Sequence, residues 1–200
     1  MLREKLLNKP FCISMLVIGL VYGLALPFCW GNDPTSELGT LSLLCEDRKF
    51  FFWLWVLTTA GSVLLNTQYM YKKFNCQSKF FDALCILSFL GMCGVALTLG
   101  HSIADWNPKR VLHWIATGVY IALTVAAIAL FFILNRKKHK HFDVLTVCTF
   151  LIFSTFAVLF AVIGKSAVME MVPMALLKVF LFIINFTPLI KAETTQRGCC

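Results

Sequence analysis

Four side chains in this sequence have the types that hold a catalytic metal ion. A catalytic zinc takes three protein ligands, usually histidine or carboxylate groups, and keeps one position open for the attacking water. His101 and His113 could supply two ligands, and either Asp105 or Glu170 could supply the third. This set predicts metal-assisted hydrolysis as one chemistry open to the protein.

Two further residues, Ser36 and Glu37, could orient the water or bind a ligand directly. Each candidate also has a structural alternative. Ser36 could cap a short helix, and Glu37 could offset the dipole of that helix. His101 and His113 could anchor the ends of membrane spans beside tryptophans. The residue types alone leave both interpretations open.

Lys178 is an ionisable residue in the interior of an apolar stretch, about two turns from its start. A charge there is costly, so it either extends outward to the membrane surface or pairs with a buried acid such as Glu170 or Glu37. We include Lys178 among the candidate ligand-binding residues.

The composition around these residues is that of a membrane protein. Of the 200 residues, 59% are hydrophobic and 14% are charged, against about 45–50% and about 25% in soluble globular domains. Mean hydropathy is +0.79. These values exclude a soluble domain and a disordered chain. The net charge of +8 lies in short runs between apolar stretches, which indicates membrane topology rather than nucleic-acid binding.

A helix needs roughly 20 mostly apolar residues to cross a bilayer. The stretches that qualify predict an all-α bundle of six transmembrane helices in one domain covering residues 1–200, with 191–200 as a short cytoplasmic tail. They are Phe11–Trp30, Phe50–Met70, Phe81–Gly100, Leu112–Leu134, Val144–Gly164 and Val172–Ile190.

The placement of basic residues predicts the orientation. If the N-terminus is cytoplasmic, twelve of the eighteen Lys and Arg residues fall on the cytoplasmic side, five fall on the other side, and Lys178 lies within a span. Positive loops are retained in the cytosol during insertion. Both termini should therefore be cytoplasmic.

This topology brings the polar candidates to the non-cytoplasmic face. A pocket there could hold Ser36, Glu37, His101, Asp105, His113 and Glu170. The cytoplasmic run Arg136–His141 is explained by topology and by attraction to anionic lipids. We expect His139 to be solvated in that loop and His113 to face the bundle.

Cysteines are numerous but contain no C-x-x-C pair, so zinc-ribbon and thioredoxin-like spacings are lacking. Cys29 and Cys45 both fall on the non-cytoplasmic side. They could form a disulfide if that side is oxidising.

The order of several short motifs resembles the six-span membrane proteins of domain-of-unknown-function family 998, which are loosely similar in layout to the Frag1/DRAM/Sfk1 proteins. The matching features are Ser36-Glu37-Leu38-Gly39, Gly91, Gly94, Gly100, Asp105, Leu112-His113 and, loosely, Glu170. The sequence departs from the family in having His101 where an apolar segment with proline is expected, and in its cysteine-rich ends. The resemblance implies six spans and no established activity.

Three functions stay open at this stage. The first is a non-enzymatic protein that binds or senses a lipid or a membrane partner through its non-cytoplasmic pocket. The second is a metal-dependent lipid hydrolase, possible zinc ligands being His101, His113 and Asp105; alkaline ceramidases offer an analogy, but they have seven spans and a His-x-x-x-His pair. The third is a small-solute or ion transporter. The expected partners are membrane lipids and other membrane proteins, with no nucleic acid.

Overall fold

The computed structural model describes residues 6–29, 33, 35, 41, 45, 47–99, 108–164, 166–188 and 190. Within this part the chain is helical and contains no strand. The long helices are α2 (Lys9–Ala25), α4 (Lys49–Lys73), α5 (Lys79–Leu97), α6 (Pro108–Asn135), α7 (Phe142–Ile163) and α8 (Ala167–Phe186). Short 3₁₀ turns, η1 (Leu26–Phe28) and η3 (Arg136–Lys138), follow α2 and α6.

Each of the six long helices is long and apolar enough to cross a membrane. The prediction of an all-α chain with six spans is therefore confirmed at the level of helix number, length and composition. The second to fifth predicted spans begin and end within four residues of α4, α5, α6 and α7, because a long apolar run dominates the signal for a membrane helix. The first predicted span begins within two residues of α2, but α2 ends at Ala25 rather than Trp30 and is followed by η1.

The sixth span was predicted less well. It begins at Ala167 rather than Val172, and its helix ends at Phe186 rather than Ile190. Ser166 caps the helix, since its hydroxyl oxygen accepts a hydrogen bond from the backbone N–H of Met169 at 3.4 Å. Pro188 follows the end of the helix and disfavours helical geometry in the residue before it. Glu170 consequently lies in the first turn of α8, not in a connection.

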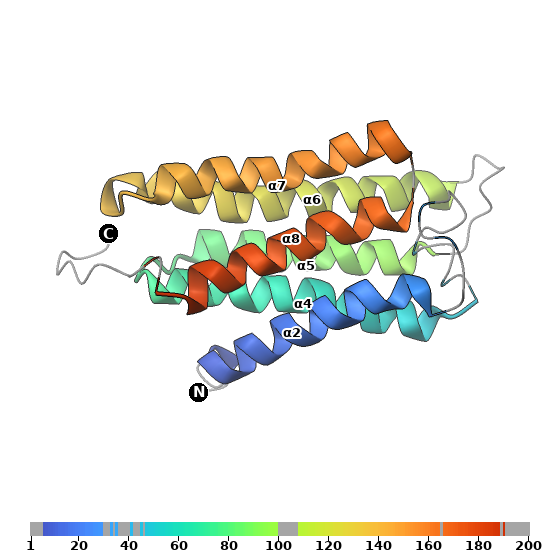
Figure 1. Cartoon of the computed structure of the whole chain (residues 1–200), viewed down its shortest axis with the longest axis horizontal. Coiled ribbons are helices and arrows are strands. Elements are labelled where there is room, and N and C mark those ends of the chain that lie inside the picture. Colours follow the sequence, from blue (N-terminus) through green and yellow to red (C-terminus); the bar gives the residue numbers. More distant parts are fainter. Residues whose placement is uncertain are drawn as a thin grey trace.

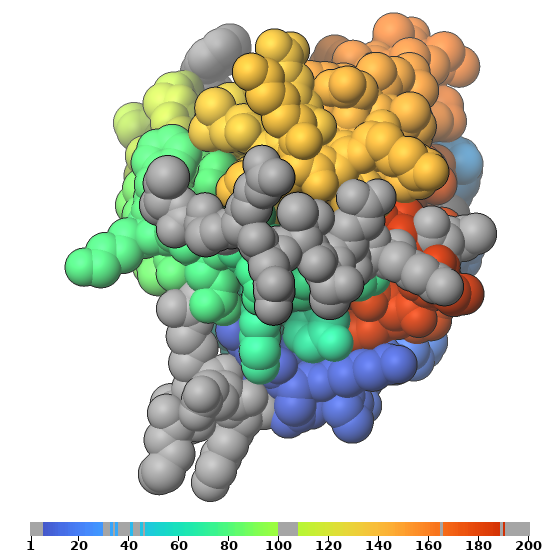
Figure 2. Space-filling model, turned by 90° about the vertical axis from the view of Figure 1, so that its left-hand side faces the viewer, coloured from blue at the N-terminus to red at the C-terminus, as the bar shows by residue number. Residues whose placement is uncertain are grey.

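Five helices form a closed ring. Each of α4, α5, α6, α7 and α8 contacts the next in chain order, and α8 contacts α4. Helix α2 contacts α4 and α8 and packs against that pair from outside the ring. Figure 1 shows the helices side by side, and Figure 2 looks along them, with α2 in blue below α4 and α8.

The two ends of the bundle differ in character. At the end that we call the basic end, α4, α6 and α8 finish and α2, α5 and α7 begin. Lys72, Lys73 and Lys79 lie there, as does η3. An aromatic cluster, buried except for the half-buried Phe74, fills the ring at this end, with ring centroids 4.8–6.2 Å apart. Its members are Tyr71, Phe74, Phe81, Phe131, Phe132 and Phe142.

His139 joins this cluster, so the expectation that it is solvated is wrong. Its side chain is 6% exposed. The imidazole stacks on Phe142 at 5.1 Å and meets Phe74 edge-on at 5.6 Å. An imidazole has an aromatic face that packs on phenyl rings, and the basic run around it hid this role in the sequence.

The opposite end, which we call the pocket end, is packed less tightly. The buried residues of α7 are Phe142, Leu145 and Thr149, and all belong to the half of α7 nearer the basic end. In the first part of α6, from Pro108 to Val119, His113 is the one buried residue. Figure 1 shows α7 rising away from α6 toward this end. Space inside the ring is therefore found here.

Two glycines bring helices close together. A Cβ at Gly19 would lie 2.6 Å from the carbonyl oxygen of Thr58, so α2 packs on α4 as closely as it does only without a side chain at Gly19. A Cβ at Gly91 would lie 3.2 Å from the backbone nitrogen of Tyr120. Gly91 thus permits the close contact between α5 and α6.

Candidate ligand pocket

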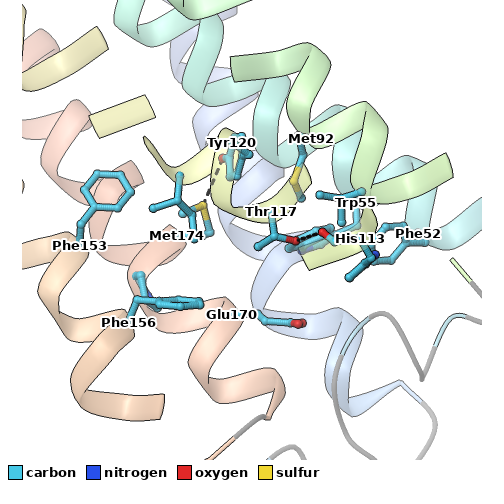
Figure 3. Close-up of a pocket in the computed structure, with 13 residues that line it drawn as sticks. Phe52, Trp55, Met92, His113, Thr117, Tyr120, Phe153, Phe156, Glu170 and Met174 are labelled. Carbon is cyan, nitrogen blue, oxygen red and sulfur yellow. Dashed lines mark hydrogen bonds between the residues drawn. The ribbon is translucent and has the colours of Figure 1, made fainter. Parts of the chain in front are cut away.

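A pocket lies inside the five-helix ring at the pocket end (Figure 3). Its volume is about 60 Å³, which gives space for about four to six water-sized groups. All five ring helices contribute to its wall. The lining residues are Phe52, Trp55, Met92, Val95, His113, Thr117, Tyr120, Ile121, Phe153, Phe156, Glu170, Pro173 and Met174.

Most of this wall is apolar and aromatic. Phe153 and Phe156 of α7 stand on one side in Figure 3, and Phe52 and Trp55 of α4 stand on the other. The hydroxyl of Tyr120 donates to the sulfur of Met174 at 3.3 Å, so this polar group already has a partner. A wall of this kind binds apolar groups, since ligand pockets bury most of a ligand against hydrophobic side chains.

His113 is one of the polar groups in the wall, and its predicted position facing the bundle is confirmed. It is 7% exposed. Its Nδ1 lies 3.2 Å from the hydroxyl oxygen of Thr98. That hydroxyl is also 2.8 Å from the carbonyl oxygen of Gly94, to which it donates. Which of the two atoms donates in the contact between Nδ1 and the Thr98 hydroxyl depends on the tautomer of the ring.

Glu170 is the other polar group with functional potential. Its Oε2 accepts a hydrogen bond from the backbone N–H of Leu41 at 3.0 Å. Leu41 belongs to the connection between α2 and α4 and is fully buried. A carboxylate in the first turn of α8 is also favoured by the helix dipole. These interactions hold the carboxylate beside the pocket.

The structure thus places two of the predicted site residues, His113 and Glu170, in one pocket wall. Ser36, Glu37, His101 and Asp105 lie outside the described residues. Among the residues that are described, no group of three His, Cys, Asp or Glu side chains could hold a metal ion. Because His101 and Asp105 were needed as ligands, the zinc site stays a prediction.

Lys178 neither extends outward nor pairs with Glu170, and its pairing with Glu37 stays a prediction because Glu37 lies outside the described residues. The side chain of Lys178 is 2% exposed, so it does not extend outward. Its ammonium donates to the carbonyl oxygen of Gly19 at 2.7 Å and to the hydroxyl oxygen of Thr59 at 3.3 Å. No carboxylate in the described part of the chain pairs with it, Glu170 included. The absence of a side chain at Gly23 leaves room for the ammonium, because a Cβ there would lie 3.3 Å away.

Polar residues continue from Lys178 toward the basic end along the contact of α4 with α8. The two helices run parallel, and Thr59 and Asn66 on α4 face Lys178 and Asn185 on α8 at the same seven-residue spacing. The amide of Asn185 donates to the carbonyl oxygen of Asn66 at 2.9 Å. We call these four residues the polar seam. The side-chain oxygens of Asn66 and Asn185 accept no hydrogen bond from the described residues.

Cys29 and Cys45 are free thiols in the structure. Cys29 is exposed and Cys45 is buried. Burial raises the pKa of Cys45 to about 11, and the nearby charges of Glu170 and Cys29 add to this while Arg48 opposes it. Their pairing in an oxidising compartment stays a prediction.

The aromatic wall of the pocket was missed by the sequence analysis. In a membrane protein, apolar residues face lipid, a packed neighbour or a pocket, and hydropathy does not separate these cases. One usable signal was Pro173, which lies inside α8 and lines the pocket. A proline within a helix removes a backbone hydrogen bond and often marks an irregular, functional part of a span.

Comparisons with protein-family models, with curated proteins and with solved structures found no match to this chain.

Proposed function

We propose that this six-span protein binds a membrane-dissolved amphipathic molecule in the pocket inside its helix ring. The observation that carries the proposal is the composition of the pocket wall. Apolar and aromatic side chains from five helices surround the space, and His113 and Glu170 give it polar groups. An alkyl or aryl group would fill the apolar part, and the polar head would contact those two side chains.

The packing of the bundle supports the same function. The aromatic cluster fills the ring at the basic end, which favours the pocket end as the side from which a ligand enters. At the pocket end, the half of α7 that lines the pocket contributes no buried residue. This weakly packed half of α7 can move to admit a ligand at low energetic cost.

We further propose that the pocket end faces away from the cytosol and that both termini are cytoplasmic. The support is the distribution of Lys and Arg across the loops. Membership of family 998 is likewise a proposal, supported by the order of the short motifs alone.

Binding is tested with a photoactivatable alkyl alcohol and the full chain in lipid nanodiscs. Thr117 lines the pocket, and its hydroxyl donates only within its own helix, to the carbonyl oxygen of His113 at 2.9 Å. Thr117→Phe therefore fills the pocket without removing a contact between helices. We expect it to lower covalent incorporation at least about fivefold.

Thr146→Phe is the matched control. Thr146 also donates to its own helix, to the carbonyl oxygen of Phe142 at 2.9 Å, and it does not line the pocket. Incorporation should stay at the wild-type level in this variant. Equal incorporation in wild type and both variants would refute binding in the pocket.

Transport is a second candidate, favoured by the polar seam. Buried polar residues in spans are costly and often mark the route of an ion or a proton. If the polar seam serves transport, Lys178→Met should abolish the flux of protons or ions into proteoliposomes. The alcohol probe should still bind in this variant. Flux unchanged by this substitution would exclude a role for the Lys178 ammonium.

A further inference from the structure

Five aromatic residues and one carboxylate share the pocket wall. The rings belong to Phe52 and Trp55 of α4, Tyr120 of α6, and Phe153 and Phe156 of α7. The carboxylate is that of Glu170. In Figure 3, Glu170 lies between Phe156 on one side and the α4 rings on the other.

Aromatic faces carry partial negative charge and attract cations, most strongly when water is excluded. Among the described lining residues, Glu170 is the one with a formal charge. The rings and the carboxylate therefore favour the same sign of ligand charge. Building on the proposed function, we propose that the ligand is a cationic amphiphile, with an amine or quaternary ammonium head beside Glu170.

The other polar groups of the wall do not set a preference for charge. The hydroxyls of Tyr120 and Thr117 donate to Met174 and to the backbone of α6. The ring of His113 contacts the hydroxyl of Thr98. An anionic head would face the Glu170 carboxylate, and this repulsion is strong where the surroundings are apolar.

The positive charge of Lys178 does not cancel this preference. Its ammonium donates to α2 and α4, through Gly19 and Thr59. The small space around it is lined by α2, α4 and α8, whereas the ligand pocket has no residue of α2. Trp55 and Met174 line both spaces and therefore lie between them.

The test measures competition against the photoactivatable alcohol in nanodiscs. Dodecyltrimethylammonium and dodecyl sulfate are each titrated over the same range of concentrations in the membrane, since the two share a tail and differ in head charge. We expect the ammonium compound to halve labelling at a concentration about tenfold lower than the sulfate requires. Equal competition by the two compounds would overturn the proposal.

Glu170→Gln should reduce this preference to within about twofold, while the neutral alcohol still labels the pocket. Asp143→Asn is its control, because Asp143 is also an acid in a first helical turn but is exposed at the basic end. A preference that persists in Glu170→Gln would contradict the role of the carboxylate.

A second pair of variants keeps the test decisive if Glu170→Gln misfolds. Phe156→Leu removes a ring from the pocket wall, and Phe150→Leu removes an exposed ring of the same helix. The first should weaken competition by the ammonium compound at least about threefold, and the second should not. No change in either variant would count against the aromatic contribution. If the alcohol fails to label the wild-type pocket at all, the proposed function itself fails.

Discussion

Lys178 shows at the scale of a single residue how an apolar helix bundle encloses an ionisable side chain. The ammonium is enclosed by three helices and donates to a backbone carbonyl and a hydroxyl. A carbonyl partner leaves no trace in the sequence, because every residue has one. The place of Lys178 in an apolar run left both outward extension and a buried pair open, so neither its burial nor its carbonyl partner could be predicted.

We predict that Lys178→Met leaves stability within about 1 kcal/mol of wild type, because apolar residues of similar size often replace buried charges without loss. Lys178→Glu should be about 3–5 kcal/mol less stable, since a buried carboxylate would face the carbonyl of Gly19. Thermal unfolding in one detergent compares them. If the Met variant is as unstable as the Glu variant, the ammonium is required for folding.

Cys29 and Cys45 should differ in reactivity, because the thiolate is the form that reacts with maleimides. Cys29 is exposed, whereas Cys45 is buried with a pKa raised to about 11. At pH 7, the thiolate fraction of Cys45 is therefore about a hundredfold lower than that of a thiol with the usual pKa of 9.0. Peptide mapping should find Cys29 modified and Cys45 protected.

Raising the pH should increase the rate of maleimide labelling at Cys45 by up to about tenfold per pH unit, until the pH approaches the pKa of this thiol. Rapid labelling of Cys45 at pH 7 would mean that the connection before α4 does not pack as described. Recovery of a linked Cys29–Cys45 peptide under nonreducing conditions would instead confirm the predicted disulfide.

At the scale of helices, close packing depends on glycines whose role the sequence does not reveal. Gly19 lies against the backbone of α4, whereas a Cβ at Gly118 in α6 would meet nothing within 4 Å. Both are glycines within apolar helices, and only the positions of the neighbouring helices distinguish them.

Gly19→Ala should therefore lower the free energy of unfolding by about 1–3 kcal/mol, because α2 must move away from α4. Gly118→Ala should be neutral or stabilising by up to about 1 kcal/mol, since alanine has the higher helix propensity. Denaturant or thermal unfolding measures both. Equal changes in the free energy of unfolding for the two variants would mean that α2 does not pack on α4 as closely as described.

The start of α8 marks the limit of sequence reasoning at this scale. Hydropathy placed it at Val172, but the cap at Ser166 and the acid in the first turn extend the helix to Ala167. The pocket was hidden for a related reason. Its rings look like any other apolar residues of a span until the ring of helices is known.

At the scale of the whole molecule, one end of the bundle is closed by aromatic packing and the other encloses a pocket. The sequence predicted the number of helices, and it predicted that the polar candidates lie at one end of the bundle. It could not predict which of them meet, because that depends on the rotation of each helix about its axis.

The orientation in the membrane is predicted from the basic residues. Cysteines introduced into a cysteine-free variant at Lys138 and at Asp105 should be labelled from opposite sides of the membrane, with position 138 cytosolic. Labelling of position 105 from the cytosol would reverse the topology.

An amphiphile that binds inside the ring, and not on the lipid-facing surface, must react with residues that line the pocket. Mass-spectrometric mapping of the sites modified by the photoactivatable alcohol tests this most directly. We expect adducts on pocket-lining residues of α6 and α8, such as Thr117, Ile121 and Met174. Adducts confined to exposed residues of α7, such as Leu151, Val158 and Val162, would contradict it.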